Sequence, residues 1–420
     1  MRFWMVFLAL AIGGIAGFLI ATSPRPIPPT EFAQIASDPR LISRGASLAA
    51  IGNCDSCHTA TGDARLAGGR AILTPFGAIY STNITPDRDT GLGSWSEAAF
   101  QRAMRDGISR DGHYLYPAFP YDHFRIVTTE DIQALFAYLE SRPPVKAAAH
   151  ENAVWFPLKI RRLVGIWNWL FLKKATRHGD PNQSPEWNRG AYLVEGLGHC
   201  GACHTPRNIL GAERSGHALA GGRAEGWDAY ALNGTSPAPI AWDVDSLATF
   251  LKAGSHRQHG NARGPMLPVT VDLGRVADAD VHAIATYISW SMQVGRKTFA
   301  TLVKPEIDDS SAGADIFVAS CAACHSNGDA PPFGGLDLTL STAVNAPEPR
   351  NIALVTLAGL PAADGRAAGM MPGFDGAISN QDLVALLSFM RRRFTAQPPW
   401  RNPQRAIKTA QDALKENASP

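Results

Sequence analysis

The stretch Cys54-Asp55-Ser56-Cys57-His58 decides the fold, because its C-x-x-C-H pattern returns twice along the chain. The second copy is Cys200-Gly201-Ala202-Cys203-His204, and the third is Cys321-Ala322-Ala323-Cys324-His325. The pattern is typical of covalent haem attachment, in which two thiols bond to the vinyl groups of the ring. The adjacent histidine then binds the iron through a neutral ring nitrogen. The sequence therefore predicts three haem c groups, with the six cysteines as attachment points and His58, His204 and His325 as iron ligands.

Zinc sites and redox-active thiols also use C-x-x-C pairs. A tetrathiolate zinc site needs two pairs, so three pairs leave one pair unmatched. Histidine is scarce, with 12 among 420 residues, yet one follows every pair. The three motifs use all six cysteines and leave none for a disulfide. These observations favour haem over both alternatives.

The composition is that of an ordinary globular protein. Hydrophobic residues make up 45%, charged residues 18%, and the net charge is +2. That balance argues against a nucleic-acid-binding protein and against a disordered chain. The 39 glycines and 30 prolines suit loop-rich domains that wrap around a large apolar cofactor.

A helical pattern precedes and follows each motif. An opening segment lies shortly before the cysteines, and a closing segment has the form Asp-x-x-Ala-aliphatic-x-x-aromatic, which predicts an amphipathic helix with an acidic first turn. The opening segments start at Arg44, Arg189 and Ala312, and the closing segments start at Asp131, Asp280 and Asp382. Each unit therefore consists of a helix, a haem motif, a long loop and a helix, as expected of duplicated domains.

The predicted fold is mainly α, with three tandem cytochrome c-like domains after an N-terminal apolar helix. The expected boundaries are 1–29 for a signal or membrane anchor with a Pro-rich spacer, 30–145 for the first domain, 146–184 for an aromatic and basic connecting strap, 185–300 for the second domain, 301–397 for the third domain and 398–420 for a C-terminal tail. Within the tail, only residues 404–416 show a weak helical pattern.

The N-terminus predicts export. After Met1-Arg2, an uninterrupted apolar run from Phe3 to Ala21 is just long enough to span a bilayer. The nearest small-residue cleavage site is followed by Pro24, so we favour an uncleaved anchor over a removed signal. Arg2 on the short side predicts a cytoplasmic tip and a periplasmic body. Covalent haem attachment on the outer side of the bacterial cytoplasmic membrane requires the same location.

The strap contains residues 154–174, which are rich in Trp, Phe and Leu with interspersed Lys and Arg. Such a composition is typical of a helix in a membrane interface. It is also typical of a buried connection between domains, or of a surface that docks a partner subunit. We weigh contact with protein above contact with the membrane.

A second axial ligand for each iron is expected to be Met or His. Only eight methionines exist, and two of them stand in Gly/Pro loops between a haem motif and its closing helix. These are Met266, in Gly264-Pro265-Met266-Leu267-Pro268, and Met371, in Met370-Met371-Pro372-Gly373. Met370 competes with Met371, while His256 and His259 are the fallback ligands of the second domain.

The first domain departs from this pattern. Phe119, followed by Pro120, stands where Met371 stands in the third domain, and a phenyl ring cannot bind iron. Three interpretations stay open. His123 binds the iron, Met104 binds it from an apparent helix, or the iron is left five-coordinate. We favour His123.

These segments together resemble the triheme cytochrome c subunits of bacterial membrane-bound periplasmic dehydrogenases. The resemblance covers nearly the whole chain after residue 35. It rests on Thr82-Asn83-Ile84-Thr85-Pro86-Asp87, Thr90-Gly91-Leu92-Gly93-Ser94-Trp95, Tyr116-Pro117-Ala118, the part of the strap from Phe156-Pro157 to Phe171, Cys203-His204-Thr205-Pro206-Arg207-Asn208, Gly264-Pro265-Met266 and Met371-Pro372. It implies covalent haem at each cysteine pair and methionine ligands at Met266 and Met371. It also implies a catalytic dehydrogenase partner and electron delivery to ubiquinone or a terminal oxidase.

The family has branches that serve quinoprotein alcohol dehydrogenases, flavoprotein sugar dehydrogenases, and molybdenum hydroxylases with an iron–sulfur subunit. In the first two branches a methionine usually stands at the position of Phe119. Phenylalanine there resembles the molybdenum branch, which oxidises aldehydes or N-heterocycles.

The sequence thus predicts an electron-transfer subunit of a respiratory chain rather than an enzyme. We find no dinucleotide-binding, P-loop or nucleophile-elbow motif. A stand-alone haem peroxidase is the rival from another class, because Phe119 makes an open first iron conceivable.

Overall fold

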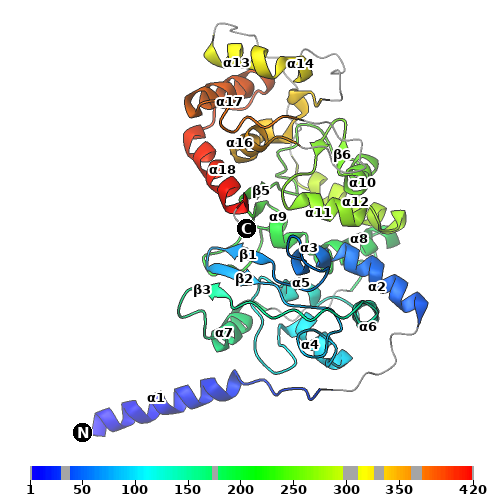
Figure 1. The fold of residues 1–420 in the computed structure, drawn as a ribbon, viewed down its shortest axis with the longest axis vertical. Helices are drawn as coiled ribbons and strands as arrows, with labels where there is room; N and C mark the ends of the chain where they lie inside the picture. Colours follow the sequence, from blue (N-terminus) through cyan, green and yellow to red (C-terminus); the bar gives the residue numbers. More distant parts are fainter. Residues whose placement is uncertain are drawn as a thin grey trace. The chain divides into compact units, whose positions relative to one another are not determined.

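The computed structural model describes residues 2–29, 38–172, 178–296, 311–325, 335–360 and 371–418. It is mainly helical, as predicted, and divides into two compact units (Figure 1). Unit 1 comprises Met1–Asn182 with Glu195–His199, and unit 2 comprises Gln183–Val194 with Cys200–Pro420. The boundaries of three separate domains stay a prediction.

The first helix, α1, runs from Arg2 to Ala21. In the described part of the chain, no helix has both the length and the hydropathy that are needed to cross a membrane. The anchor expected at residues 3–21 therefore stays a prediction.

Unit 1 holds the first repeat and the strap. Its further helices are α2 (Pro39–Ile51), α3 (Cys54–His58), α4 (Glu97–Asp106), α5 (Tyr121–Phe124), α6 (Thr129–Glu140) and α7 (Arg162–Phe171). A three-stranded antiparallel sheet joins β1 (Ala71–Thr74), β2 (Gly77–Tyr80) and β3 (Ala153–Val154) in that order, with Ala71 opposite Tyr80 and Gly77 opposite Val154.

Side-chain caps fix where the helices of unit 1 begin. Asp38 accepts a hydrogen bond from the backbone of Arg40, and Pro39 occupies the first helical position of α2. Ser96 caps α4 and Thr128 caps α6 in the same way. These residues satisfy backbone N–H groups that have no partner inside the helix.

Unit 2 holds the second and third repeats. The second consists of α8 (Pro185–Glu195, whose last residue belongs to unit 1), α9 (Gly201–His204), α10 (Val244–Ala253), α11 (Met266–Leu273) and α12 (Asp278–Gln293), with the antiparallel pairs β4 (Gly222–Ala224) with β5 (Trp227–Ala229) and β6 (Ser255–His256) with β7 (Gly260–Asn261). The third consists of α13 (Ala312–Ser320), α14 (Ala322–His325), the 3-10 turn η3 (Leu338–Leu340), α15 (Thr342–Asn345), α16 (Arg350–Ala358), α17 (Asn380–Phe394) and α18 (Pro403–Ala418).

One glycine brings the opening and closing helices of each repeat together. A Cβ at Gly45 of α2 would lie 1.9 Å from the carbonyl oxygen of Ala134 in α6. Gly190 meets Ala283 at 1.9 Å, and Gly313 meets Ala385 at 2.3 Å. Since a real Cβ never approaches a carbonyl so closely, only glycine permits these helix crossings.

An ion pair reinforces the crossing in the first two repeats. Arg44 lies 2.6 Å from the buried carboxylate of Asp131, and Arg189 lies 2.8 Å from Asp280. Ala312 occupies the corresponding place in the third repeat, so this pair has no counterpart there.

Two features differ from the sequence predictions. The long loops contain short antiparallel strands, which the sequence pattern does not predict. The weak helical pattern of residues 404–416 does form a helix, α18, but this part of the expected tail packs into the third-repeat core through Ile407 and Ala410, 1% and 0% exposed. Most residues of α18 are polar, but a narrow stripe of apolar residues runs along the helix. Helices α16 and α17 bury that stripe.

Candidate haem-binding sites

The first motif forms the short helix α3. Asn53, directly before it, has a φ of 50°, which places the residue in the left-handed region. The Nδ1 atom of His58 lies 2.7 Å from the carbonyl oxygen of Thr82. Because a carbonyl only accepts hydrogen bonds, Nδ1 carries the proton, and Nε2 is the nitrogen that can bind a metal.

The second motif repeats this arrangement. Cys200 leads into α9, and the Nδ1 of His204 lies 2.6 Å from the carbonyl oxygen of Tyr230. In the first and second repeats, the loop after the motif also contains a leucine with positive φ, 63° at Leu66 and 56° at Leu219. The matching backbone donors are Gly68 to the His58 carbonyl, 2.7 Å, and Gly221 to the His204 carbonyl, 2.8 Å.

The third motif holds its histidine in the same way. The Nδ1 of His325, at the end of α14, lies 2.9 Å from the carbonyl oxygen of Leu336. Iron-binding histidines commonly donate their second ring N–H to a carbonyl, which fixes the tautomer and the ring orientation. The same contact between a histidine Nδ1 and a backbone carbonyl occurs in all three motifs.

The surroundings of the motif side chains argue against redox-active thiols and against a zinc site. Burial lowers the pKa values of His58 and His204, and it thereby favours the neutral imidazole that binds metal. Burial also raises the pKa of the Cys200 thiol to about 12 and that of Cys321 to about 11. Reactive redox cysteines instead have lowered pKa values, so these thiols do not fit that alternative. Among the described residues, no group of three ligand atoms brings these cysteines within metal-binding distance of one another.

The two candidate methionine ligands lie on well-defined backbone. Met266 is the first residue of α11 and follows Gly264, whose φ is 54°. Met371 pairs with Leu360 through two backbone hydrogen bonds of 2.8 and 2.9 Å. Both side chains are half-buried. Met370 lies outside the described residues, and the assignments of Met266 and Met371 stay predictions.

In the first repeat, Phe119 packs its ring 5.3 Å from that of Phe124. Met104 lies on α4, as expected, and is only 6% exposed. His123 lies on α5 with its Nδ1 2.8 Å from the carbonyl oxygen of Glu195. Only its Nε2 is therefore suited to reach an iron. All three interpretations of the first haem stay open, and His123 stays the predicted ligand.

The fallback ligand His259 makes packing contacts. Its ring stacks on Trp242 with centroids 3.5 Å apart and an interplanar angle of 13°. Burial, followed by the neighbouring His256, lowers the pKa of His259 to about 4. Stacking on tryptophan gives His259 a structural role in the second repeat, which favours Met266 over it as the ligand.

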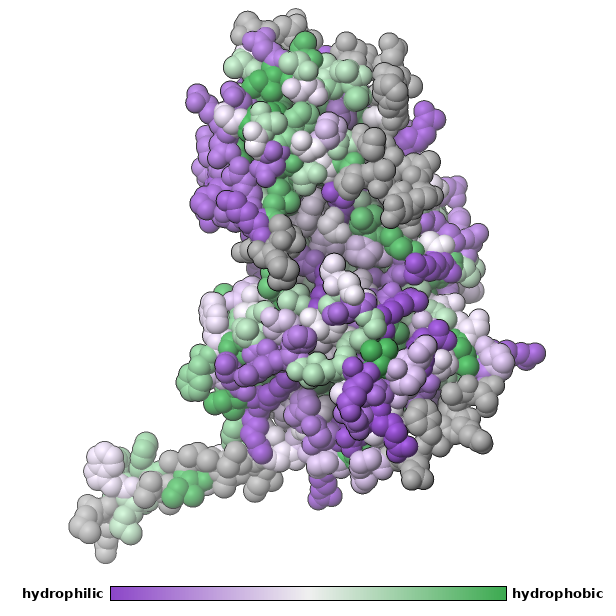
Figure 2. Space-filling view, viewed as in Figure 1, coloured by the Kyte–Doolittle hydropathy of each residue, from purple (hydrophilic) through white to green (hydrophobic). Residues whose placement is uncertain are grey.

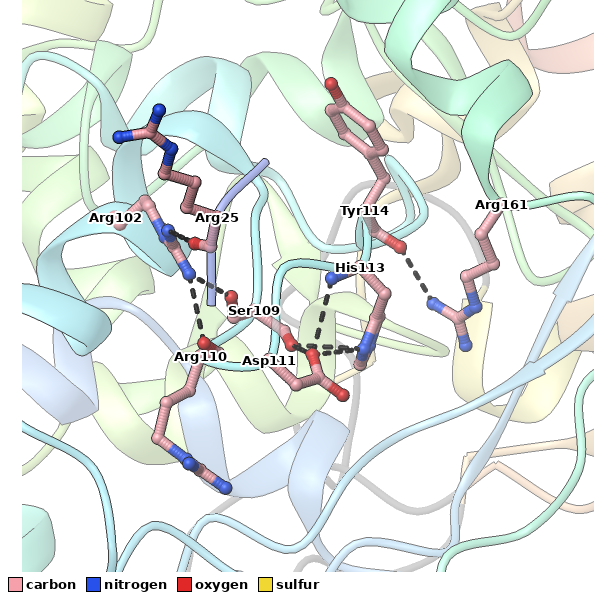
Figure 3. A network of polar contacts seen from close by, with 8 residues as sticks. All are labelled: Arg25, Arg102, Ser109, Arg110, Asp111, His113, Tyr114 and Arg161. Atoms are coloured by element: carbon pink, nitrogen blue, oxygen red, sulfur yellow. Dashed lines mark hydrogen bonds and ion pairs between the residues drawn. The ribbon is translucent and has the colours of Figure 1, made fainter. Parts of the chain in front are cut away.

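A network of polar contacts attaches the Pro-rich spacer to the first repeat (Figure 3). The guanidinium of Arg102 donates to the carbonyls of Arg25, 2.7 Å, and Ser109, 2.5 Å. The loop that contains Ser109 continues to Tyr114, whose carbonyl accepts a 3.0 Å hydrogen bond from Arg161 of the strap. One loop therefore holds both the spacer and the strap.

The strap exposes aromatic side chains. Trp155, Phe156 and Trp169 are 66%, 80% and 83% exposed. Figure 2 shows hydrophobic surface on the side of unit 1 that carries β3 and α7. Exposed apolar area of this kind is typical of an interface, with lipid or with a partner protein.

Cysteine pairs followed by carbonyl-held histidines define this chain as a c-type cytochrome. The cytochrome c family model matches residues 42–143 and 310–393. The chain is 35% identical to the gluconate 2-dehydrogenase cytochrome c subunit of Pantoea cypripedii, over 91% of each chain. It is 34% identical to the cytochrome c subunit of the quinone alcohol dehydrogenase of Komagataeibacter europaeus, over 99% of this chain and 90% of that protein.

A further relative is a subunit of the nicotinate dehydrogenase of Pseudomonas putida, which is 42% identical over 95% of this chain. The present chain spans only 34% of the length of that protein. The chain belongs to the family of cytochrome c subunits of dehydrogenases, and the resemblance seen in the sequence is confirmed.

We expect a haem-to-protein ratio of three in the purified chain, because each of the three motifs carries two thiols and a positioned histidine. The alkaline pyridine haemochrome assay against protein mass measures this ratio. A ratio of two or less would contradict the assignment.

Proposed function

We propose that the chain is a triheme c-type cytochrome that receives electrons from a periplasmic dehydrogenase and passes them to ubiquinone or a terminal oxidase. The observation that carries the proposal is the threefold recurrence of a carbonyl-held histidine beside a cysteine pair, at His58, His204 and His325. Bound haem supplies one-electron chemistry, while the protein sets the ligands, burial and spacing that tune the potentials.

The partner that we favour is a molybdenum and iron–sulfur dehydrogenase that oxidises an aldehyde or an N-heterocycle. Two observations support this choice. Phe119 stands where the other branches usually carry methionine, and one relative is named for nicotinate, which is an N-heterocycle. The alternative partner is a quinoprotein alcohol dehydrogenase or a flavoprotein sugar dehydrogenase. The relatives named for gluconate and alcohol dehydrogenases support this alternative.

Purification of the chain from its native membranes, with metal analysis of the complex, tests this proposal. We expect a dehydrogenase subunit and molybdenum to co-purify, and nicotinate or a related N-heterocycle, or an aldehyde, to reduce the haems. Co-purification of a flavin or a quinone cofactor without molybdenum would select the alternative partner.

We further propose that the body lies on the periplasmic face of the cytoplasmic membrane and that residues 3–21 attach it there. The apolar composition of this run supports the proposal. N-terminal sequencing of the mature protein should start at or near Met1, whereas a start beyond residue 16 would show a removed signal.

Replacing His123 by alanine should change the first haem. If His58 and His123 are its axial ligands, its potential lies below those of the two His/Met haems, because imidazole favours ferric iron more than a thioether does. The substitution should therefore alter the spectrum and the potential of one haem, measured by redox titration with low-temperature spectra.

His113→Ala is the matched control. His113 lies in the same repeat, but it bonds to Ser109 and Asp111 in the loop that holds the Pro-rich spacer, so its replacement should leave the haem spectra and potentials unchanged. Unchanged spectra and potentials in His123→Ala would make His123 an ordinary packing residue and leave Met104 or a five-coordinate iron.

A further inference from the structure

The carbonyl that holds His204 lies at the end of a short hairpin. β4 and β5 pair antiparallel, with Arg223 opposite Asp228, and Tyr230 follows β5 directly. The Tyr230 carbonyl accepts the 2.6 Å hydrogen bond from the Nδ1 of His204. The position of this hairpin therefore decides how strongly the imidazole of His204 is hydrogen-bonded.

A residue of the third repeat holds the hairpin. Asn351, in the first turn of α16, accepts a 2.9 Å hydrogen bond from the backbone N–H of Asp228 through its Oδ1. Its Nδ2 donates a 2.8 Å bond to the Asp228 carbonyl. The amide thus pairs with both backbone groups of one residue, and it is only 7% exposed. Such a buried two-bond contact fixes the strand two residues before Tyr230.

Charge and packing support the same contact. The Asp228 carboxylate lies 3.4 Å from Arg350 of α16 and 3.0 Å from Arg223. The side chain of Trp227 packs against the buried core of the third repeat. The hairpin is therefore anchored by backbone, charged and apolar groups, and most of these belong to the third repeat.

A second contact runs in the opposite direction. A Cβ at Gly260 of β7 would lie 3.3 Å from the side chain of Leu336, whose carbonyl holds His325. Arg263 also donates a 2.9 Å hydrogen bond to the carbonyl of Gly359, next to the residue that pairs with Met371. The second and third repeats thus touch at the segments that hold their predicted iron ligands.

We propose that Asn351 of the third repeat positions the histidine ligand of the second repeat, so that an intact third repeat sets the redox potential of the haem at Cys200 and Cys203. Asn351 acts through the hairpin, because both of its hydrogen bonds go to the backbone of Asp228. A hydrogen bond from Nδ1 to a carbonyl makes the imidazole a stronger electron donor and so stabilises ferric iron. Loosening the hairpin weakens that bond, and the potential rises.

The test compares Asn351→Ala with Asn345→Ala in the full-length, haem-loaded protein. Asn345 is equally buried, at 7%, and its Nδ2 also bonds to two backbone carbonyls, those of Thr339 and Ser341, both inside the third repeat. Redox titration of each variant resolves the potentials of the haems. A variant with both Cys200 and Cys203 replaced by alanine identifies the second-repeat haem by its absence.

We expect Asn351→Ala to shift the potential of the second-repeat haem upward, while Asn345→Ala leaves it at the wild-type value although both variants lower the unfolding temperature. An unchanged potential in Asn351→Ala, with a lowered unfolding temperature, would overturn the proposal and leave Asn351 a purely structural contact. Should Asn351→Ala fail to accumulate, Asn351→Ser removes the same two bonds and is judged by the same outcomes. The proposal rests on haem being bound at Cys200 and Cys203, and the haemochrome assay on the wild type tests that separately.

Discussion

Alanine at Gly190 is expected to destabilise the second repeat strongly and to reduce its haem content. The new Cβ would lie 1.9 Å from the carbonyl oxygen of Ala283 and 2.9 Å from the Cβ of Tyr287. Neither neighbour is the end of a flexible side chain, so α8 and α12 must move apart. Overpacking of this kind costs about 1–3 kcal/mol of unfolding free energy, and more where backbone must shift.

The sign of the stability change distinguishes a close helix crossing from an effect of helix propensity. Alanine is the better helix former by about 1 kcal/mol, so helix propensity alone predicts stabilisation by Gly190→Ala. Thermal unfolding and the haemochrome assay should instead show a lower unfolding temperature and less haem. The control is Gly17→Ala in α1, where nothing lies within 4 Å of the added Cβ. Equal unfolding temperatures for Gly190→Ala and the wild type would contradict the tight crossing.

The sequence predicts the helices that cross, because the signals that identify a helix are local. An acidic residue near the helix start and apolar groups at helical spacing identify the closing helices at Asp131, Asp280 and Asp382, and the structure places all three in helices, α6, α12 and α17. The C-x-x-C-H motifs likewise contain both thiols and the adjacent histidine within five residues. Interactions between residues that are close in the sequence can therefore be recognised from the sequence alone.

The partners of the histidines leave no such pattern. The accepting carbonyl follows His58 by 24 residues, His204 by 26 and His325 by 11. The acceptor is a backbone oxygen, which any residue type supplies, and Thr82, Tyr230 and Leu336 share no side-chain chemistry. Neither spacing nor residue type could have identified them.

Contacts between repeats could not be predicted from the sequence for a similar reason. Asn351 looks in the sequence like an ordinary polar residue at the start of a helix, since its partner Asp228 lies 123 residues away. The strands of the long loops were missed because each is only two to four residues long, too short for an alternating pattern to be recognised. Elements this short form only where tertiary packing holds them together.

Replacing Met266 or Met371 by leucine should each change a single haem. Leucine has nearly the volume of methionine, so packing is conserved, but it offers no sulfur to iron. We expect the affected haem to lose its sixth ligand, to become high-spin and to fall in potential by the order of 0.1 V, a fraction of the roughly 0.8 V that axial ligands span. Absorption spectra and redox titration measure both effects.

The chain offers the same substitution at two core positions. Met292 of α12 and Met390 of α17 are 4% and 5% exposed, and each belongs to the repeat of one candidate ligand. Leucine at either should cost less than about 1.5 kcal/mol of unfolding free energy and leave every haem spectrum unchanged. If Met371→Leu behaves like Met390→Leu, the thioether of Met371 is no ligand, and its pairing with Leu360 serves only to close the loop before α17. In the second repeat, comparing Met266→Leu with Met292→Leu distinguishes Met266 from His259 as the ligand. Leucine at Met266 leaves His259 stacked on Trp242, so a changed haem spectrum would identify Met266 and an unchanged spectrum would favour His259.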